Sequence, residues 1–251
     1  MSKYKISQSA LKSFFDPLVC DLKWEEIYLN GYRTEPSVAM LDGLVFEQHV
    51  IGFSRGGEVY EIPKGKKGQA LKREIDLLKL AEESKQIMHD LDIELIDVQP
   101  HWEVGDLVGH PDALIKYKGE LALMDLKYTG VREDEKCRWN PFAWGQIVDP
   151  QTGEIYKDFK QALHYVEMYY QTHGVYLPFF YLVFGKSGWV KFILIDISEN
   201  ALNEYRDLLE RFRVEFKNFN PKPINNFEIC RKCTVLCDKR TNKPNIETIT
   251  I

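Results

Sequence analysis

The chain has 251 residues, of which 44% are hydrophobic and 13% aromatic, and its formal net charge is −5. This length supports one large domain or two small ones with a real core. The charge argues only weakly against nucleic-acid binding, because positive charge can be confined to one groove. No apolar run reaches the roughly 18 residues that a membrane span needs, and residues 1–12 have no apolar signal-peptide core. We therefore expect a globular, cytoplasmic protein without a membrane partner.

The first 90 or so residues are predicted to form three helices, over residues 7–31, 37–53 and 68–92. We expect Pro17 to break the first of them, because proline has no backbone N–H to continue the helical hydrogen bonds. In the third, apolar side chains recur at helical spacing from Leu71 through Ile75 to Met88.

After residue 92 the apolar residues no longer recur at helical spacing, and three consecutive strands are predicted over residues 93–104, 107–118 and 120–128. A short turn at Lys118 and Gly119 is expected to join the last two strands. Residues 131–155 are polar and rich in Trp and turn residues, which indicates an insertion or an active-site loop.

The remainder is predicted to contain a helix over residues 156–174, strands over 175–185 and 189–197, and a helix over 198–219. Ser198 is the expected N-cap of that last helix, and Pro221 ends it. This order indicates one mixed α/β domain. Its parts would be a helical N-terminal part (about residues 1–90), a core (about 91–220) and a cysteine-bearing tail (about 221–240).

Two charged residues interrupt one of the most apolar predicted strands. Asp125 and Lys127 lie in the run LALMDLK, and burying a charge costs free energy unless the charge is paired or bound to a metal. Side chains two residues apart point to the same face of a strand. Asp125 and Lys127 should therefore project together, while Leu126 turns into the core.

Asp112 follows a Gly-His-Pro sequence and would lie beside Asp125 if the two strands pair across the turn at Gly119. Two carboxylates that converge repel each other unless a cation lies between them, and such oxygen ligands suit Mg²⁺ or Mn²⁺. A neighbouring lysine can orient or deprotonate a water, or stabilise charge that develops on a phosphate. The alternative interpretation is a strand-end salt bridge between Asp125 and Lys127.

Pro111-Asp112 followed by Asp125-Leu126-Lys127 resembles the signature of the PD-(D/E)xK nuclease superfamily. The two aspartates are 125 − 112 = 13 positions apart, which suits a hairpin that returns the second strand beside the first. The resemblance implies a restriction-endonuclease-like core sheet flanked by helices. It also implies a divalent ion held by both aspartates and the Leu126 carbonyl, with Lys127 positioning the attacking water.

Other residues are similar to the RecB-like branch of that superfamily, which includes the Cas4 nucleases. That branch carries a Q-x-x-x-Y motif on the helix after the catalytic strands, matched here by Gln161 and Tyr165, which share a helix face. It also has a metal-ligating His or Glu shortly after a glycine on an upstream helix. Glu47 follows Gly43 by four residues, and His49 lies about 200° further round the helix. The resemblance favours Glu47 as the third ligand, with His49 as the alternative.

The cysteines are Cys20, Cys137, Cys230, Cys233 and Cys237. A C-terminal trio favours metal over disulfides in a cytosolic chain. Several RecB-like nucleases hold a [4Fe–4S] cluster with one cysteine before the nuclease core and three after it, and this chain is similar, although its last spacing is shorter. The resemblance implies a [4Fe–4S] cluster that clamps the C-terminal tail through Cys20 and the trio, with Zn²⁺ on the same thiolates as the alternative.

Together these resemblances imply a metal-dependent DNA exonuclease that acts on single-stranded ends, with Gln161 and Tyr165 fixing the substrate strand. DNA would be its partner, together with a helicase or a recombination or CRISPR protein. One alternative is an endonuclease or resolvase of the same superfamily. Another is a non-catalytic nucleic-acid-binding subunit, against which the intact set of Asp112, Asp125 and Lys127 argues.

Overall fold

The computed structural model describes residues 4–52, 57–132, 146–148, 155–157, 159–224, 226–233 and 235. The chain divides into two compact units. The terminal unit comprises the described residues of Met1–Glu35 and Asn203–Ile251, and the central unit comprises those of Pro36–Leu202. All predicted catalytic residues lie in the central unit. The organisation as a single nuclease domain stays a prediction.

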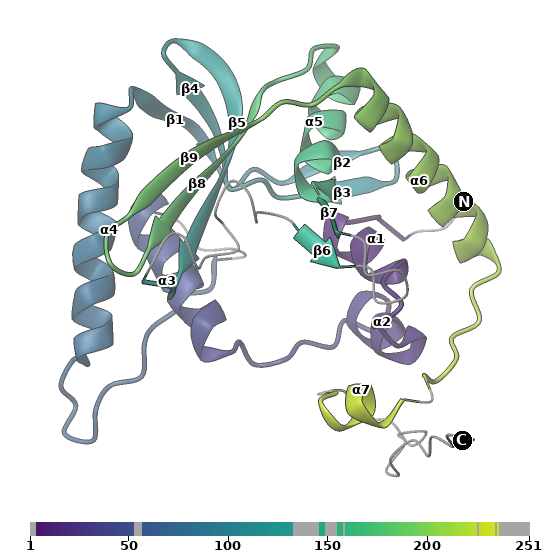
Figure 1. The fold of residues 1–251 in the computed structure, drawn as a ribbon, viewed down its shortest axis with the longest axis horizontal. Coiled ribbons are helices and arrows are strands. Elements are labelled where there is room, and N and C mark those ends of the chain that lie inside the picture. The colour runs from purple at the N-terminus through teal and green to yellow at the C-terminus, as the bar shows by residue number, and fades with distance from the viewer. Residues whose placement is uncertain are drawn as a thin grey trace, which may run out of the picture. The chain divides into compact units, whose positions relative to one another are not determined.

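A five-stranded mixed sheet forms the centre of the central unit, in the order β1-β4-β5-β8-β9 (Figure 1). Its strands are β1 (Ile93–Val98), β4 (Ala113–Tyr117), β5 (Glu120–Thr129), β8 (Phe179–Gly185) and β9 (Val190–Ile195). β5 and β8 pair in parallel, and the other neighbouring strands pair antiparallel. With the helices on both faces of the sheet, this confirms the predicted mixed α/β class.

The turn between β4 and β5 sets the register of the predicted site. Lys118 and Gly119 have φ angles of 51° and 84°, which is the left-handed conformation that a two-residue hairpin turn of type I′ requires. Ala113 therefore lies opposite Met124. The residue before Ala113 is Asp112, which comes level with Asp125 as the sequence predicts.

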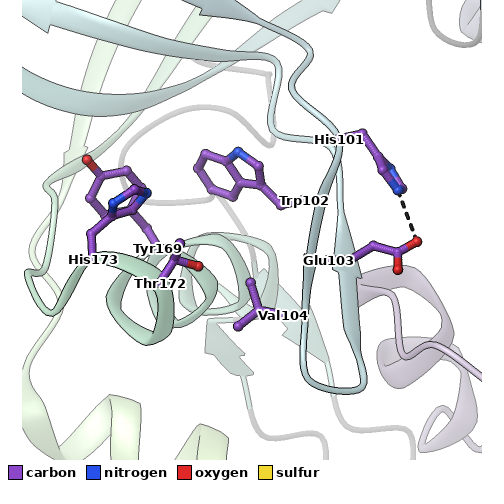
Figure 2. A pocket seen from close by; sticks show the side chains of 7 residues that line it. All are labelled: His101, Trp102, Glu103, Val104, Tyr169, Thr172 and His173. Carbon is purple, nitrogen blue, oxygen red and sulfur yellow. Dashed lines mark hydrogen bonds and ion pairs between the residues drawn. The ribbon is translucent and has the colours of Figure 1, made fainter.

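Two of the predicted strands are shorter than expected, and the prediction of continuous strands over residues 93–104 and 107–118 was wrong. Pro100 and Pro111 each interrupt one of them, because proline cannot donate to a strand ladder. The separated pieces form β2 (Trp102–Val104) and β3 (Leu107–Gly109), an antiparallel hairpin outside the main sheet. Figure 2 shows Trp102 and Val104 pointing toward helix α5, while His101 and Glu103 point away from it.

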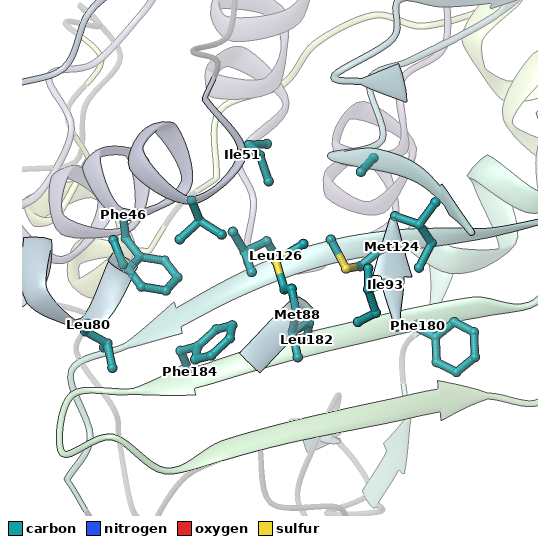
Figure 3. Close-up of a cluster of buried hydrophobic side chains, with 14 of the residues drawn as sticks. Phe46, Ile51, Leu80, Met88, Ile93, Met124, Leu126, Phe180, Leu182 and Phe184 are labelled. Atoms are coloured by element: carbon teal, nitrogen blue, oxygen red, sulfur yellow. The ribbon is translucent and has the colours of Figure 1, made fainter. Parts of the chain in front are cut away.

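Three helices flank the sheet: α3 (Val38–Ile51), α4 (Lys72–Asp90) and α5 (Lys160–His173). α3 and α4 cover one face, where a continuous apolar core includes Phe46, Leu80, Met124 and Leu182 (Figure 3). α5 covers the opposite face, since its Tyr165 ring stacks on Phe179, which points away from that core. The predicted site lies on the α5 side of the sheet.

The helix predicted over residues 68–92 is confirmed as α4, but its buried stripe differs from the expected one. Ile75 is 56% exposed, and the face toward the core is formed by Leu77, Leu80, Ala81 and Met88. In the described part of the chain, no helix combines the length and the apolar character that crossing a membrane requires.

The terminal unit contains α1 (Gln8–Phe14), α2 (Asp21–Tyr28), most of α6 (Glu199–Lys217) and α7 (Phe227–Arg231). The expected break near Pro17 separates α1 from α2. An aromatic core joins these helices: the ring of Phe14 lies 5.1 Å from Trp24 and 4.7 Å from Phe212, between centroids. The hydroxyl oxygen of Ser198 accepts the Ala201 N–H at 3.2 Å, which confirms the predicted N-cap of α6.

Two short strands that the sequence did not predict lie within and at the end of the predicted insertion over residues 131–155, and the second of them occupies the start of the helix predicted over 156–174, which begins only at Lys160. They are β6 (Gln146–Val148) and β7 (Ile155–Lys157), which pair antiparallel. Residues 133–145 and 149–154, with Cys137, lie outside the described residues.

Candidate active site

The centre of the candidate site is a buried ion pair on β5. Asp125 is fully buried, and the ammonium group of Lys127 forms an ion pair with its Oδ2 atom. Leu126 between them packs in the core on the other face, as the strand alternation predicts. The salt bridge considered as an alternative is therefore present. A buried pair of this kind is tolerated only when further hydrogen bonds satisfy its polar atoms.

Asp112 supplies the second carboxylate beside this pair. It is 1% exposed, and its Oδ2 atom accepts the backbone N–H of Leu126 at 2.9 Å. The side chain thus continues the hydrogen bonding between β4 and β5 beyond Ala113, where the backbone pairing of β4 begins. The hairpin places both aspartates at the same end of β4.

Helix α5 provides a second contact to Asp125. The side-chain amide of Gln161 donates to Oδ1 of Asp125 at 2.6 Å. One turn further along, the Tyr165 hydroxyl donates to the backbone carbonyl of His110 at 3.0 Å. The two residues share a helix face, as predicted. In the structure they contact Asp125 and the segment that leads into Asp112, and their role in fixing a substrate strand stays a prediction.

α5 also packs closely on strand β3, which precedes Asp112. A Cβ atom at Gly109 would lie 2.7 Å from Cε1 of Tyr165, so only glycine allows this approach. Nε2 of His164 donates to the carbonyl of Val108 at 2.9 Å. Burial lowers the pKa of His164 to about 4, although the hydrogen bond to Val108 acts in the opposite direction. His164 is therefore neutral near pH 7.

Gln99 connects α3 to Asp112, and sequence reasoning missed it. Its side-chain amide donates to Oε1 of Glu47 on α3, and its backbone N–H donates to the carbonyl of Asp112 at 2.9 Å. Gln99 has a φ angle of 47°, an uncommon left-handed conformation for a residue with a side chain. The only signal in the sequence was a polar residue before Pro100, between two apolar strands.

The contact of Gln99 with Glu47 distinguishes Glu47 from His49, the two residues considered as the third ligand. Glu47 is buried and bonded to Gln99, which leads directly to Asp112. His49 is half-buried, and it lies two residues further along the helix, about 200° away. The structure thus brings Glu47, rather than His49, to the residue that adjoins Asp112.

The donor chemistry of the site fits a hard divalent cation. Oε1 of Gln99 is buried and accepts no hydrogen bond from any described residue, and it belongs to the amide that contacts Glu47. Carboxylate, amide and carbonyl oxygens are the ligands that Mg²⁺ prefers. Within the described ranges, no three His, Cys, Asp or Glu side chains are arranged as a metal-binding group. A cation at Asp125 would share this carboxylate with Lys127 and Gln161 or replace one of them.

In the terminal unit, the described cysteines approach one another through the backbone of Ile224. The N–H of Ile224 lies 3.4 Å from Sγ of Cys20, and the Cys230 thiol donates to the Ile224 carbonyl at 3.5 Å. The Cys233 thiol contacts the carbonyl of Val235 at 3.8 Å. Cys237 lies outside the described residues. Residues from the two ends of the chain are thus brought to one place.

Comparison with known proteins identifies the fold. The chain is similar to the crystal structure of a candidate exonuclease from Eubacterium rectale, with a TM-score of 0.64 and 19% identity over 98% of this chain and 91% of that chain. At this identity the likeness shows a shared fold alone.

Two further structures are those of the alkaline exonuclease LHK-Exo from Laribacter hongkongensis, the second of them in complex with dAMP. They have TM-scores of 0.46 and 0.48, both with 11% identity over 85% of this chain and 88% of that chain. With TM-scores below 0.5, these likenesses carry no inference. No family model and no curated protein matches the sequence.

Proposed function

We propose that this chain is a metal-dependent deoxyribonuclease of the PD-(D/E)xK superfamily, in its RecB-like branch, and that it digests single-stranded DNA from its ends. The observation that carries the proposal is the environment of Asp125. This buried carboxylate contacts Lys127 and Gln161 and lies level with Asp112 across the β4–β5 hairpin. The fold shared with a candidate exonuclease supports the same assignment.

In this proposal Asp112, Asp125, Glu47 and the Leu126 carbonyl hold Mg²⁺ or Mn²⁺. When bound, such an ion polarises the scissile phosphate and lowers the pKa of a coordinated water. Lys127 reaches Asp125 from the same strand face and can donate to the attacking water or to a phosphate oxygen.

The two residues of the Q-x-x-x-Y motif take supporting roles. Gln161 orients the Asp125 carboxylate, and Tyr165 fixes the segment that carries His110 into Asp112. Hydrogen bonds from neighbouring residues to a metal ligand, or to the segment that carries it, keep the ligand in one orientation. Gln161 can also donate to a substrate phosphate once its Asp125 partner is engaged elsewhere.

The assignment is tested with purified protein, Mg²⁺ or Mn²⁺, and single-stranded DNA in linear and circular form. We expect linear strands to be degraded while circles survive, and Asp112→Ala to lose cleavage while it still binds DNA. Cleaved circles would change the assignment to an endonuclease. Binding without any cleavage by the wild-type protein would favour a non-catalytic DNA-binding subunit.

We further propose that Cys20, Cys230, Cys233 and Cys237 hold a structural [4Fe–4S] cluster. Its support is the approach of the Cys20 and Cys230 thiols to the backbone of Ile224 from both ends of the chain. Thiolates in this number suit iron–sulfur clusters, and they also suit zinc.

Anaerobic purification tests the cluster. We expect brown protein with iron and sulfide, and Cys20→Ser should bleach the colour and lower the stability of the fold. Colourless protein with stoichiometric zinc would replace the cluster by a zinc clamp. Colourless, metal-free protein whose stability is unaffected by Cys20→Ser would reject the proposal that these cysteines bind a metal.

A further inference from the structure

A pocket of about 190 Å³ lies between the β2–β3 hairpin and the C-terminal half of α5. Its walls include Trp102 and Val104 from β2, and Tyr169, Thr172 and His173 from α5 (Figure 2). The volume is below the roughly 300–1,000 Å³ typical of sites for drug-sized ligands. The pocket therefore suits a single flat group rather than a larger ligand.

The walls of this pocket are aromatic. The Trp102 ring lies 5.7 Å from Tyr169, and the Tyr169 ring lies 4.2 Å from His173, between centroids. The indole N–H of Trp102 donates to no other residue in the described part of the chain. Thr172 uses its hydroxyl proton on the Met168 carbonyl, at 3.0 Å, and keeps its lone pairs as acceptors. The pocket combines ring faces with polar groups that can bind the edge of a flat heterocycle.

The charge of the lining favours an uncharged occupant over a phosphate. Among the described residues that line the pocket, none is Lys or Arg. Its one acidic member, Glu103, points away from α5 and contacts the His101 ring at 3.1 Å. A phosphate would meet no Lys or Arg side chain among these lining residues, whereas an uncharged base would find stacking surfaces.

α5 connects this pocket to the candidate active site. Gln161, Tyr165 and Tyr169 follow one another at intervals of four residues and contact Asp125, His110 and Trp102 in turn, the last of these through ring packing. Eight residues of helix span about 12 Å. At 3.4 Å per stacked nucleotide of one strand, this distance corresponds to three or four nucleotides.

We propose that this pocket binds one unpaired base of the strand whose phosphate lies at Asp112 and Asp125, three or four nucleotides from the cleaved bond. The inference rests on the proposed nuclease function and deepens it. A base within a duplex is paired and stacked on its neighbours, so it cannot enter the pocket without leaving the helix. Occupancy of the pocket would therefore favour binding of single-stranded over double-stranded DNA.

An abasic scan of the substrate tests the pocket on the full-length wild-type protein. Short single-stranded DNA carries one abasic position, moved one nucleotide at a time from the end, and binding is measured by fluorescence anisotropy in EDTA. We expect about tenfold weaker binding when the abasic position is three or four nucleotides from the end, and little change elsewhere, because base–aromatic stacking is lost at one place. Equal binding at all positions would overturn the inference.

Variants then assign the effect to Trp102. Trp102→Leu should weaken binding of the intact strand about tenfold and make the abasic position harmless, while Trp102→Phe should retain most of the affinity. Tyr176→Leu is the matched control, since Tyr176 is an exposed aromatic residue outside the pocket. An abasic penalty that is unchanged in Trp102→Leu would place the stacking elsewhere and overturn the inference.

Binding in EDTA and cleavage in Mg²⁺ separate this inference from the proposed function. Binding with the expected abasic penalty, but without cleavage, would uphold the pocket and reject the nuclease. Cleavage that tolerates every abasic position would uphold the nuclease and reject the pocket. If the protein neither binds nor cleaves single strands, both are rejected.

Discussion

Gln161 on α5 donates its side-chain amide to Oδ1 of Asp125 at 2.6 Å, and Lys127 occupies the other oxygen of the same carboxylate. Each oxygen of this buried group therefore has a defined partner. Because the donors come from a helix and from the strand itself, the orientation of Asp125 depends on how α5 packs on the sheet.

The first prediction concerns that orientation. Gln161→Ala should lower the cleavage rate by about 10- to 100-fold, because a carboxylate that loses the amide donor to one of its oxygens is held less rigidly. Gln161→Glu should be more damaging, since it sets a second negative charge beside a buried one. Initial rates on linear single-stranded DNA measure both effects. Gln171→Ala, which removes an exposed amide from the same helix, is the control. Wild-type rates for Gln161→Ala would show that the contact is dispensable.

The contacts of Asp125 also show what the sequence could reveal. The alternation around Asp125 and the turn at Gly119 follow from local rules, so both were predicted correctly. The bond from Gln161 to Asp125 joins residues 36 positions apart, and only the packing of α5 produces it. The same limit explains the error at Ile75, because helical spacing identifies an apolar stripe but not which neighbouring element covers it.

A second prediction separates Glu47 from His49. Glu47→Gln should reduce cleavage by several orders of magnitude, because a neutral amide is a weaker ligand for a divalent ion than a carboxylate. The fold should persist, since the new side chain still offers Gln99 an oxygen acceptor. His49→Ala should cost much less. Rates as a function of Mg²⁺ concentration measure both variants, and the reverse ranking would move the ligand to His49.

A third prediction uses the backbone of Gln99. Gln99→Ala and Gln99→Gly both remove the donor to Glu47, so both should lose about 10- to 100-fold in cleavage rate. Their stabilities should differ, because the left-handed conformation at φ 47° costs alanine about 1 kcal/mol or more and glycine almost nothing. Urea denaturation should therefore find the glycine variant the more stable of the two. Equal stabilities would mean that this conformation carries no strain.

Gln99 marks a further limit of sequence reasoning. The predicted strand over residues 93–104 includes Pro100, which should have ended it. Because of that error, the contact of Gln99 with Glu47 and Asp112 was not predicted. A proline interrupts strand pairing, but which residue before it adopts a left-handed conformation depends on contacts from elsewhere in the fold. Here those contacts come from α3 and from the Asp112 backbone.

The last prediction is a pH dependence of stability that originates at His164. Burial lowers its pKa in the folded protein to about 4, whereas the unfolded chain has the ordinary value near 6.5. Above pH 6.5 the group is neutral in both states, and its full contribution to stability is present. As the pH falls from 6.5 toward 4, the unfolded chain takes up a proton that the folded protein does not, so stability is lost, by about 2 kcal/mol between pH 7 and pH 5.

His164→Gln keeps a donor for the Val108 carbonyl but does not titrate, so its free energy of unfolding in urea should fall less over that range. His89→Gln, which removes an exposed histidine from α4, should retain the wild-type pH dependence. Parallel pH curves for wild type and His164→Gln would contradict the assignment.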